Sequence, residues 1–224
     1  MTIDEYFGDW MRVIDKTEAM KIMGWLKTVN TNLLCPSIRN VFKAFELCPY
    51  RELKAVFIGQ DPYSQKGVAT GILFGNKPDV PEDKLSPSLQ VIKEAVINYE
   101  IPHYGLRFDN TLESWAKQGI LMINSALTCN LNQVGSNVMI WRPFITKLLK
   151  NLSENDTAII YVLFGKQAQT LRPYINDKTN HIIEVEHPAY FARTKTKMPY
   201  SVFIKVNSIV KNLTGVPFVW YDEI

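Results

Sequence analysis

Four positions where an apolar segment gives way to a loop carry residues that could do chemistry together. These positions are Asp61, Asn124, Gly165 and His187. A carboxylate can stabilise a growing positive charge or orient a water molecule, and an imidazole can donate a hydrogen bond to a leaving group. The amide of Asn124 lies inside the apolar stretch ILMINSAL (120–127), so it is either a structural hydrogen-bonding group or a recognition group. Taken singly, GQDPY (59–63) could be only a tight turn, and a lone histidine is more often structural than catalytic.

The segments that carry these residues alternate along the chain between apolar strands and helices. Strands are expected at 55–60, 120–127, 157–165 and 181–187, where Ile, Val, Leu and Phe are concentrated. Helices are expected at 16–28, 36–45, 86–99, 112–117, 137–152, 166–172 and 200–213, and long loops at 61–85 and 188–199. This alternation predicts an α/β fold, a three-layer αβα sandwich with a central four-stranded parallel sheet. In such sheets ligands bind beyond the carboxyl ends of the strands, which is where all four positions fall.

Length and composition favour one soluble domain over residues 1–224. The chain has 46% hydrophobic and 21% charged residues. It has no apolar run near the ~20 residues of a membrane helix, and MTIDEYFGDW at its start is not a signal pattern, so a cytoplasmic location and no membrane partner are expected. Three widely spaced cysteines and three histidines make a disulfide framework, a metal site and a cofactor unexpected.

The net charge of +3 says less about a nucleic-acid partner than the distribution of charge does. No acidic residue occurs between Glu113 and Glu154 or between Glu186 and Asp222, although several Lys and Arg lie in both stretches. If the two stretches share a face, that face attracts phosphate. The alternative is that these basic residues only decorate helix surfaces.

Taken together, the motifs resemble the uracil-specific branch of the uracil-DNA glycosylase family. The resemblance covers nearly the whole chain, through the blocks VFKAF (41–45), GQDPYSQKGVATGILFG (59–75), SPSL (86–89), ESWAKQGILMINSALT (113–128), FGKQAQ (164–169) and HPAYF (187–191). The combination is specific, because all the blocks occur in the family's order and spacing. It implies a monofunctional enzyme that hydrolyses the bond between uracil and deoxyribose in single- or double-stranded DNA and leaves an abasic site.

The resemblance also implies the residues that do the chemistry. Asp61 would face the sugar, stabilise its positive charge and orient the attacking water. His187 would donate a hydrogen bond to O2 of the departing uracil anion. We expect this imidazole to be neutral, because a donor need not be charged and a buried imidazolium is unfavourable.

Four further residues would bind the flipped-out base. Phe74 would stack on the uracil ring, and Asn124 would donate to O4 and accept from N3–H, which cytosine cannot match. Tyr63 would press against C5 and exclude the methyl group of thymine. Gln60 would lie along the pocket wall and contribute backbone contacts.

The expected DNA-binding residues are less regular. Pro87 and Ser88 match a family loop that pinches phosphates. The last block departs from the family's Ser-Pro-Leu-Ser, and its expected DNA-binding residues are Pro188, Ala189, Tyr190, Phe191 and Arg193. Phe191 stands where the family has the leucine that fills the vacated base stack, so it is the expected wedge. Alternatively, Tyr190 and Phe191 pack into the core. Ser64 also departs from the family, which has histidine after GQDPY.

Two other functions remain open at this point. The altered 188–192 segment and Ser64 would fit a DNA-binding replication-accessory protein that keeps the glycosylase fold with weak catalysis. A relative from another branch would accept a broader range of bases, which Tyr63 and Asn124 argue against. The resemblance implies uracil-containing DNA as the partner, a monomer, and sensitivity to a protein inhibitor that mimics DNA.

Overall fold

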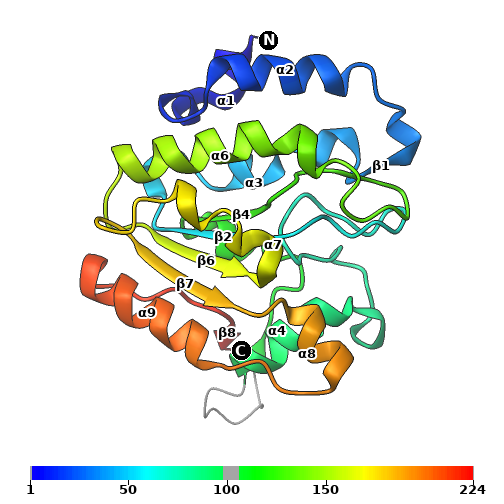
Figure 1. Ribbon diagram of the computed structural model, residues 1–224. Helices are drawn as coiled ribbons and strands as arrows, with labels where there is room; N and C mark the ends of the chain where they lie inside the picture. The colour runs from blue at the N-terminus through cyan, green and yellow to red at the C-terminus, as the bar shows by residue number, and fades with distance from the viewer. Residues whose placement is uncertain (1, 98–105, 224) are drawn as a thin grey trace.

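A four-stranded parallel sheet lies at the centre of the fold (Figure 1). The computed structural model describes residues 2–97 and 106–223. The sheet runs in the order β4-β2-β6-β7, and its strands are β2 (Ala55–Gly59), β4 (Ile120–Asn124), β6 (Ile160–Phe164) and β7 (His181–Val185). Every residue of β2 and β6 is buried, as expected for central strands covered on both faces. All four predicted strands are confirmed. β4 ends on Asn124, and β6 ends directly before Gly165. β2 and β7 each end two residues before the expected catalytic residue, Asp61 or His187.

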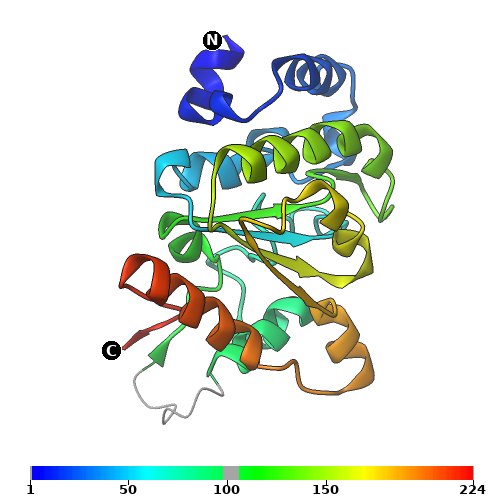
Figure 2. The same cartoon turned by 60° about the vertical axis from the view of Figure 1, so that its left-hand side comes forward.

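Helices cover both faces of the sheet, which confirms the predicted three-layer sandwich (Figures 1 and 2). On one side lie α3 (Lys43–Leu47) and α6 (Val138–Asn155). α2 (Lys16–Leu26) packs on the outside of α6, and α1 (Ile3–Phe7) lies beside α2. On the other side lie α4 (Pro87–Ile97), α8 (Pro188–Thr194) and α9 (Ser201–Thr214). Two short helices, α5 (Glu113–Lys117) and α7 (Gly165–Gln169), precede β4 and follow β6. One buried core extends from Phe7 to Trp220.

Two short antiparallel ribbons complete the fold. β1 (Leu34–Cys35) pairs with β5 (Cys129–Asn130), and β3 (Leu106–Arg107) pairs with β8 (Asp222–Glu223). No helix in the described ranges is both long and apolar enough to cross a lipid bilayer.

Two sequence expectations need correction, and a third extends beyond the described residues. The segment 36–45 is not one helix but a 3₁₀ turn, Ile38–Asn40, followed by α3. The helix expected at 86–99 is described as far as Ile97, and its last two positions lie outside the described residues. The loop expected at 188–199 is wrong over its first half, which forms α8. Pro188 occupies the first turn of this helix, where its fixed φ and missing N–H suit a helix start.

Candidate active site

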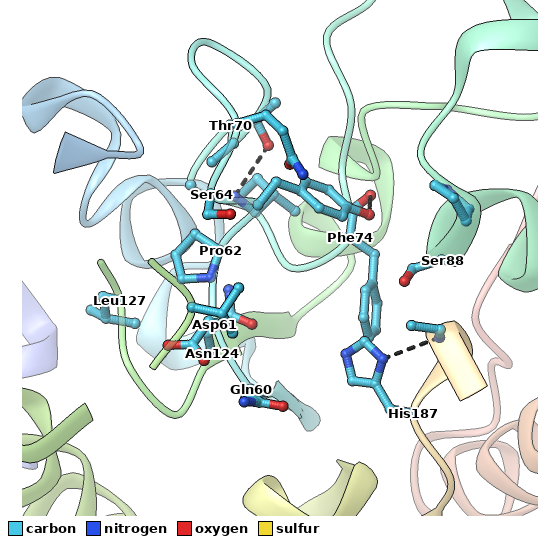
Figure 3. Close-up of a pocket in the computed structure, with 18 of the residues that line it drawn as sticks. Gln60, Asp61, Pro62, Ser64, Thr70, Phe74, Ser88, Asn124, Leu127 and His187 are labelled. Atoms are coloured by element: carbon cyan, nitrogen blue, oxygen red, sulfur yellow. Dashed lines mark hydrogen bonds between the residues drawn. The ribbon is translucent and has the colours of Figure 1, made fainter. Parts of the chain in front are cut away.

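The carboxyl ends of β2, β4 and β7 open into one cavity of about 350 Å³. All six of the expected catalytic and base-binding residues line it, and so do three of the expected DNA-binding residues: Gln60, Asp61, Tyr63, Phe74, Asn124 and His187, with Pro87, Ser88 and Ala189. Figure 3 shows Gln60, Asp61 and Asn124 on one side of the cavity and Phe74 and His187 on the other. The topology explains this convergence, because parallel strands end at the same edge of their sheet.

Three buried oxygen atoms in the cavity have no hydrogen-bond partner within the described residues. They are both carboxylate oxygens of Asp61 and Oδ1 of Asn124. Buried polar atoms are nearly always paired in folded proteins, so unpaired atoms in a cavity indicate groups kept available for a ligand. Burial raises the pKa of Asp61, while the nearby side chain of Gln60 and backbone N–H of Gly135 lower it. Neither group lies in hydrogen-bonding geometry with the carboxylate, so both oxygens remain without a partner among the described residues.

A glycine makes room for the amide of Asn124. A β-carbon on Gly59, at the end of β2, would lie 2.8 Å from Oδ1 of Asn124 and 2.3 Å from Cδ1 of Leu73. Gly59 and Asn124 are direct partners in the parallel ladder, so any larger side chain would displace the amide. The backbone carbonyl of the next residue, Gln60, already accepts two hydrogen bonds, from Ser125 Oγ at 2.7 Å and from the Ala126 N–H at 3.2 Å.

The imidazole of His187 has one nitrogen engaged and the other available. Its Nδ1 accepts a hydrogen bond from the backbone N–H of Ala189 at 3.1 Å (Figure 3). The neutral ring therefore carries its hydrogen on Nε2, and burial lowers the pKa of His187, which favours that neutral form. Gly165 lets the ring lie there, because a β-carbon on this glycine would stand 2.8 Å from Cβ of His187.

Tyr63 and Phe74 form a connected wall of the cavity. The Tyr63 hydroxyl donates to the Phe74 carbonyl at 3.1 Å and accepts from Ser86 Oγ at 2.6 Å. Phe74 has a positive φ of 62°, which a side chain of this size rarely adopts, and its ring lies edge-on to His187 with centroids 5.4 Å apart. Strain of this kind persists only where the surroundings impose it, and it is common at ligand sites.

Sequence reasoning missed the residue that holds this wall in place. Asn76 is 2% exposed, its Nδ2 donates to Ser86 Oγ at 2.7 Å, and its Oδ1 accepts from the Ser86 N–H at 2.8 Å. The signal was present, because Asn76 directly follows the apolar block ILFG, much as Asn124 follows ILMI. A buried amide in such a position needs partners, and here the partner is the serine that fixes Tyr63.

The structure does not support Phe191 as a wedge. Its side chain is only 8% exposed and belongs to the main core, while Tyr190 is 41% exposed. The cause is α8: consecutive helical residues point about 100° apart, so one ring of the pair faces inward and the other outward. The Arg193 guanidinium lies over the Tyr190 ring, 6.0 Å from its centroid. Pro188 is buried, and none of Pro188, Tyr190, Phe191 and Arg193 lines the cavity.

The expected basic face is also smaller than the acid-free stretches indicated. Lys147 forms ion pairs with Asp15 at 3.3 Å and Glu18 at 3.0 Å, on the side of α2. Its charge is therefore neutralised within the chain. No cluster of three His, Cys, Asp or Glu able to hold a metal ion occurs among residues 2–97 and 106–223. That the reaction needs no metal or cofactor stays a prediction.

Comparison with known proteins agrees with the resemblance seen in the motifs. The family model described as "Uracil DNA glycosylase superfamily" matches residues 45–211, about three quarters of the chain. The chain belongs to this family. The uracil-DNA glycosylases of Alkaliphilus metalliredigens and Fusobacterium nucleatum are 32% and 31% identical to it, each over 96% of both chains.

Solved structures show the same fold. The crystal structure of mimivirus uracil-DNA glycosylase matches with a TM-score of 0.73 and 22% identity, covering 98% of this chain and 93% of that one. The UNG structure from Nitratifractor salsuginis matches with a TM-score of 0.63 and 18% identity, covering 91% and 96%. This glycosylase is therefore an enzyme, a DNA N-glycosylase that hydrolyses the N-glycosidic bond of uracil in DNA, and the alternative of an accessory protein is not favoured.

Proposed function

We propose that this uracil-DNA glycosylase rotates uracil out of the DNA helix and cleaves its N-glycosidic bond between Asp61 and His187. The observation that carries the proposal is a pair of groups at one cavity: the Asp61 carboxylate, whose oxygens have no hydrogen-bond partner among the described residues, and His187, whose Nδ1 is occupied and whose Nε2 carries the hydrogen. Flipping is required because the sugar bond cannot be reached inside the duplex.

The two groups suit the two charges that develop as the bond breaks. The C1′–N1 bond stretches, leaving positive charge on the sugar and negative charge on the base. The Asp61 carboxylate stabilises the sugar cation and accepts a hydrogen bond from the water that attacks C1′. The Nε2–H of His187 donates to O2 of the uracil anion. Water supplies the hydroxyl that ends on C1′ and the proton that ends on uracil, so free uracil and an abasic site are the products.

The remaining cavity walls suit uracil. The Asn124 amide donates to O4 and accepts from N3–H, two contacts that cytosine reverses. Its unpaired Oδ1 supports this role, because that acceptor has no partner among the residues described. Phe74 stacks on the ring, Tyr63 excludes a methyl group at C5, and Gln60 forms part of the wall. Since the Gln60 carbonyl is already bonded, any backbone contact to the base would come from its N–H.

The proposed DNA-binding residues lie around the opening of the cavity. Pro87, Ser88 and Ala189 line the cavity. Pro188 begins α8, the helix that carries Tyr190 and Arg193. In place of the buried Phe191, Tyr190 is the side chain that enters the vacated stack, and the neighbouring Arg193 contacts phosphate. Two mimivirus UNG variants have been solved in complex with UGI. We propose that a protein inhibitor that mimics DNA binds the corresponding face of this chain.

We also propose an organisation for the enzyme. Residues 1–224 act as a single domain, supported by the main core that runs from Phe7 to Trp220. The enzyme acts as a monomer in the cytoplasm on single- and double-stranded DNA. Sedimentation tests the monomer, cell fractionation tests the location, and matched single- and double-stranded substrates test the range of DNA.

A base-release assay tests the proposal. The enzyme is incubated in chelator with an oligonucleotide that carries one uracil, and the product is cleaved with alkali. We expect scission at uracil and not at thymine or cytosine in matched oligonucleotides, with His187→Ala strongly impaired. Binding without scission would favour an accessory role, and loss of activity in chelator would show that a metal takes part.

A further inference from the structure

Two buried cysteines lie directly opposite each other behind the wall of the cavity. Cys35 ends β1 and Cys129 begins β5, and the two are paired in the antiparallel ribbon. Cys35 is 3% exposed and Cys129 is fully buried. Directly opposed residues place their side chains on the same face of a ribbon, so both thiols face the same neighbours. Neither cysteine lines the cavity itself.

Both thiols reach the backbone on either side of Tyr63. The Cys129 thiol donates to the Pro62 carbonyl with a sulfur–oxygen distance of 3.4 Å. The Cys35 thiol lies 3.5 Å from the Ser64 carbonyl, with a longer approach of 3.8 Å to the Gln65 carbonyl. Each thiol is a weak donor, but the two act on carbonyls that flank one residue. Burial raises the pKa of both thiols, that of Cys129 to about 12, so both keep the hydrogen that they donate.

The same sulfurs also support the Tyr63 side chain by packing. Cys35, Cys129 and Ala69 form a small cluster separate from the main core, with Tyr63 and Leu131 packed against it. The Tyr63 hydroxyl is fixed at the other end by Ser86 and the Phe74 carbonyl. The ring is therefore held from two sides. On the cysteine side the ring is held by packing, so the position of the ring there depends on the volume behind it.

We propose that Cys35 and Cys129 are positioning residues that hold Tyr63 forward and thereby set the space available at C5 of the bound base. This inference rests on the proposed role of Tyr63 in excluding a C5 methyl group. Removing a thiol leaves a gap of about one sulfur atom behind the ring. The ring then has room to recede, and substituents at C5 become tolerated.

The test compares bases that differ only in the size of the group at C5. Oligonucleotides carrying uracil, 5-fluorouracil or thymine are cleaved by the parent enzyme and by Cys35→Ala, Cys129→Ala and the double variant. We expect the kcat/KM for thymine relative to uracil to rise on the order of 10-fold, the selectivity that one methylene-sized difference provides. The ratio for 5-fluorouracil should rise less. The Cys35→Ser and Cys129→Ser variants keep a hydrogen-bond donor but replace sulfur with the smaller oxygen, so their ratios should lie between those of the parent and those of the alanine variants.

Cys48→Ala is the matched control. Cys48 is also fully buried but belongs to the main core, so its loss should lower stability without changing the ratios. Unchanged ratios in folded Cys→Ala variants would overturn the inference, as would serine variants whose ratios rise above those of the alanine variants. If Cys129→Ala does not fold, Cys35→Ala, at the other end of the pair, gives the same readout. The Tyr63→Ala variant distinguishes failure of the proposed role of Tyr63 from failure of the inference about the cysteines. If this variant does not cleave at thymine, the proposed role of Tyr63 is wrong. If it cleaves at thymine but the cysteine variants do not, only the inference about the cysteines fails.

Discussion

The contact between Gly165 and His187 allows the position of the imidazole to be tested without changing the imidazole. Gly165 begins α7 with a positive φ of 84°, and a β-carbon there would stand 2.8 Å from Cβ of His187 and 3.4 Å from its Cα and N. The clash involves Cβ, whose place is fixed by the backbone. A change of side-chain rotamer therefore cannot relieve it, and the start of α8 must move. We expect Gly165→Ala to displace His187 and slow uracil release.

The size of the effect follows from these distances. Carbon atoms in ordinary contact lie about 3.5–4.0 Å apart, so the alanine methyl group requires a shift approaching 1 Å. A misplacement of roughly 1 Å in a catalytic geometry lowers the rate by about 10²-fold. The left-handed backbone adds an instability of about 1–2 kcal/mol for any residue other than glycine. In a chain of this size each kcal/mol lowers Tm by about 2–4 °C.

Gly215→Ala is the control, because it has the same backbone strain without the clash. Gly215 ends α9 with a φ of 80°, and a β-carbon there would meet no atom within 4 Å. Both variants are assayed for uracil release under single-turnover conditions and for Tm by calorimetry. We expect both to lose stability but only Gly165→Ala to lose activity. Equal activities in the two variants would refute the reasoning that Gly165 sets the position of His187.

Four further results are expected. Asp61→Asn should lower uracil release by about 10²–10⁴-fold. It should also raise Tm at pH 7, because the raised pKa of Asp61 means that the ionised carboxylate destabilises the fold. This gain should vanish below pH 3.8, the ordinary pKa of Asp, and a lower Tm at pH 7 would contradict the reasoning. Because the pKa of His187 is lowered, the pH–rate profile should stay level as pH rises from about 6.5 to 8, and a decline there would show that a protonated imidazole is required. Asn124→Asp should reduce the preference for uracil over cytosine by at least about 10²-fold in competition assays, because the donor to O4 is lost; an unchanged preference would remove Asn124 from recognition. Phe191→Ala should destabilise the fold by about 3–5 kcal/mol in denaturant titrations, whereas Tyr190→Ala should weaken binding to uracil-containing DNA with little change in stability; the reverse pattern would restore Phe191 as the wedge.

The positions of β2, β4 and β6 could be predicted from the sequence because burial on both faces requires nearly continuous apolar runs. β7 is partly exposed and was predicted from its short run of Ile and Val. The residues that end those runs were predictable for the same reason, and in a parallel sheet all carboxyl ends lie at one edge. Asp61, Asn124 and His187 could therefore be assigned to one region from their places along the chain. The family resemblance of the motifs then predicted what chemistry they would perform.

The order of the strands could not be predicted in this way, because every buried strand has the same apolar pattern. The order β4-β2-β6-β7 places Asn124 beside Gly59 and His187 beside Gly165, and these neighbours determine which side chains have room. The conformation of the 188–194 segment could not be predicted from the sequence either, since a proline can begin a helix as well as a loop. Only its helical turn decided that Phe191 is buried while Tyr190 faces solvent.

The same holds for the support of the cavity. Cys35 and Cys129 have no distinctive sequence pattern around them, and their contacts with the loop that carries Tyr63 join segments that are distant in sequence. Asn76 follows an apolar block as Asn124 does, but that position does not reveal that its partner is Ser86. The sequence alone was sufficient to propose which groups react, because that proposal depends on their types and local positions. The tertiary structure alone decided how those groups are held, because packing volume and hydrogen-bond partners exist only after distant segments have come together.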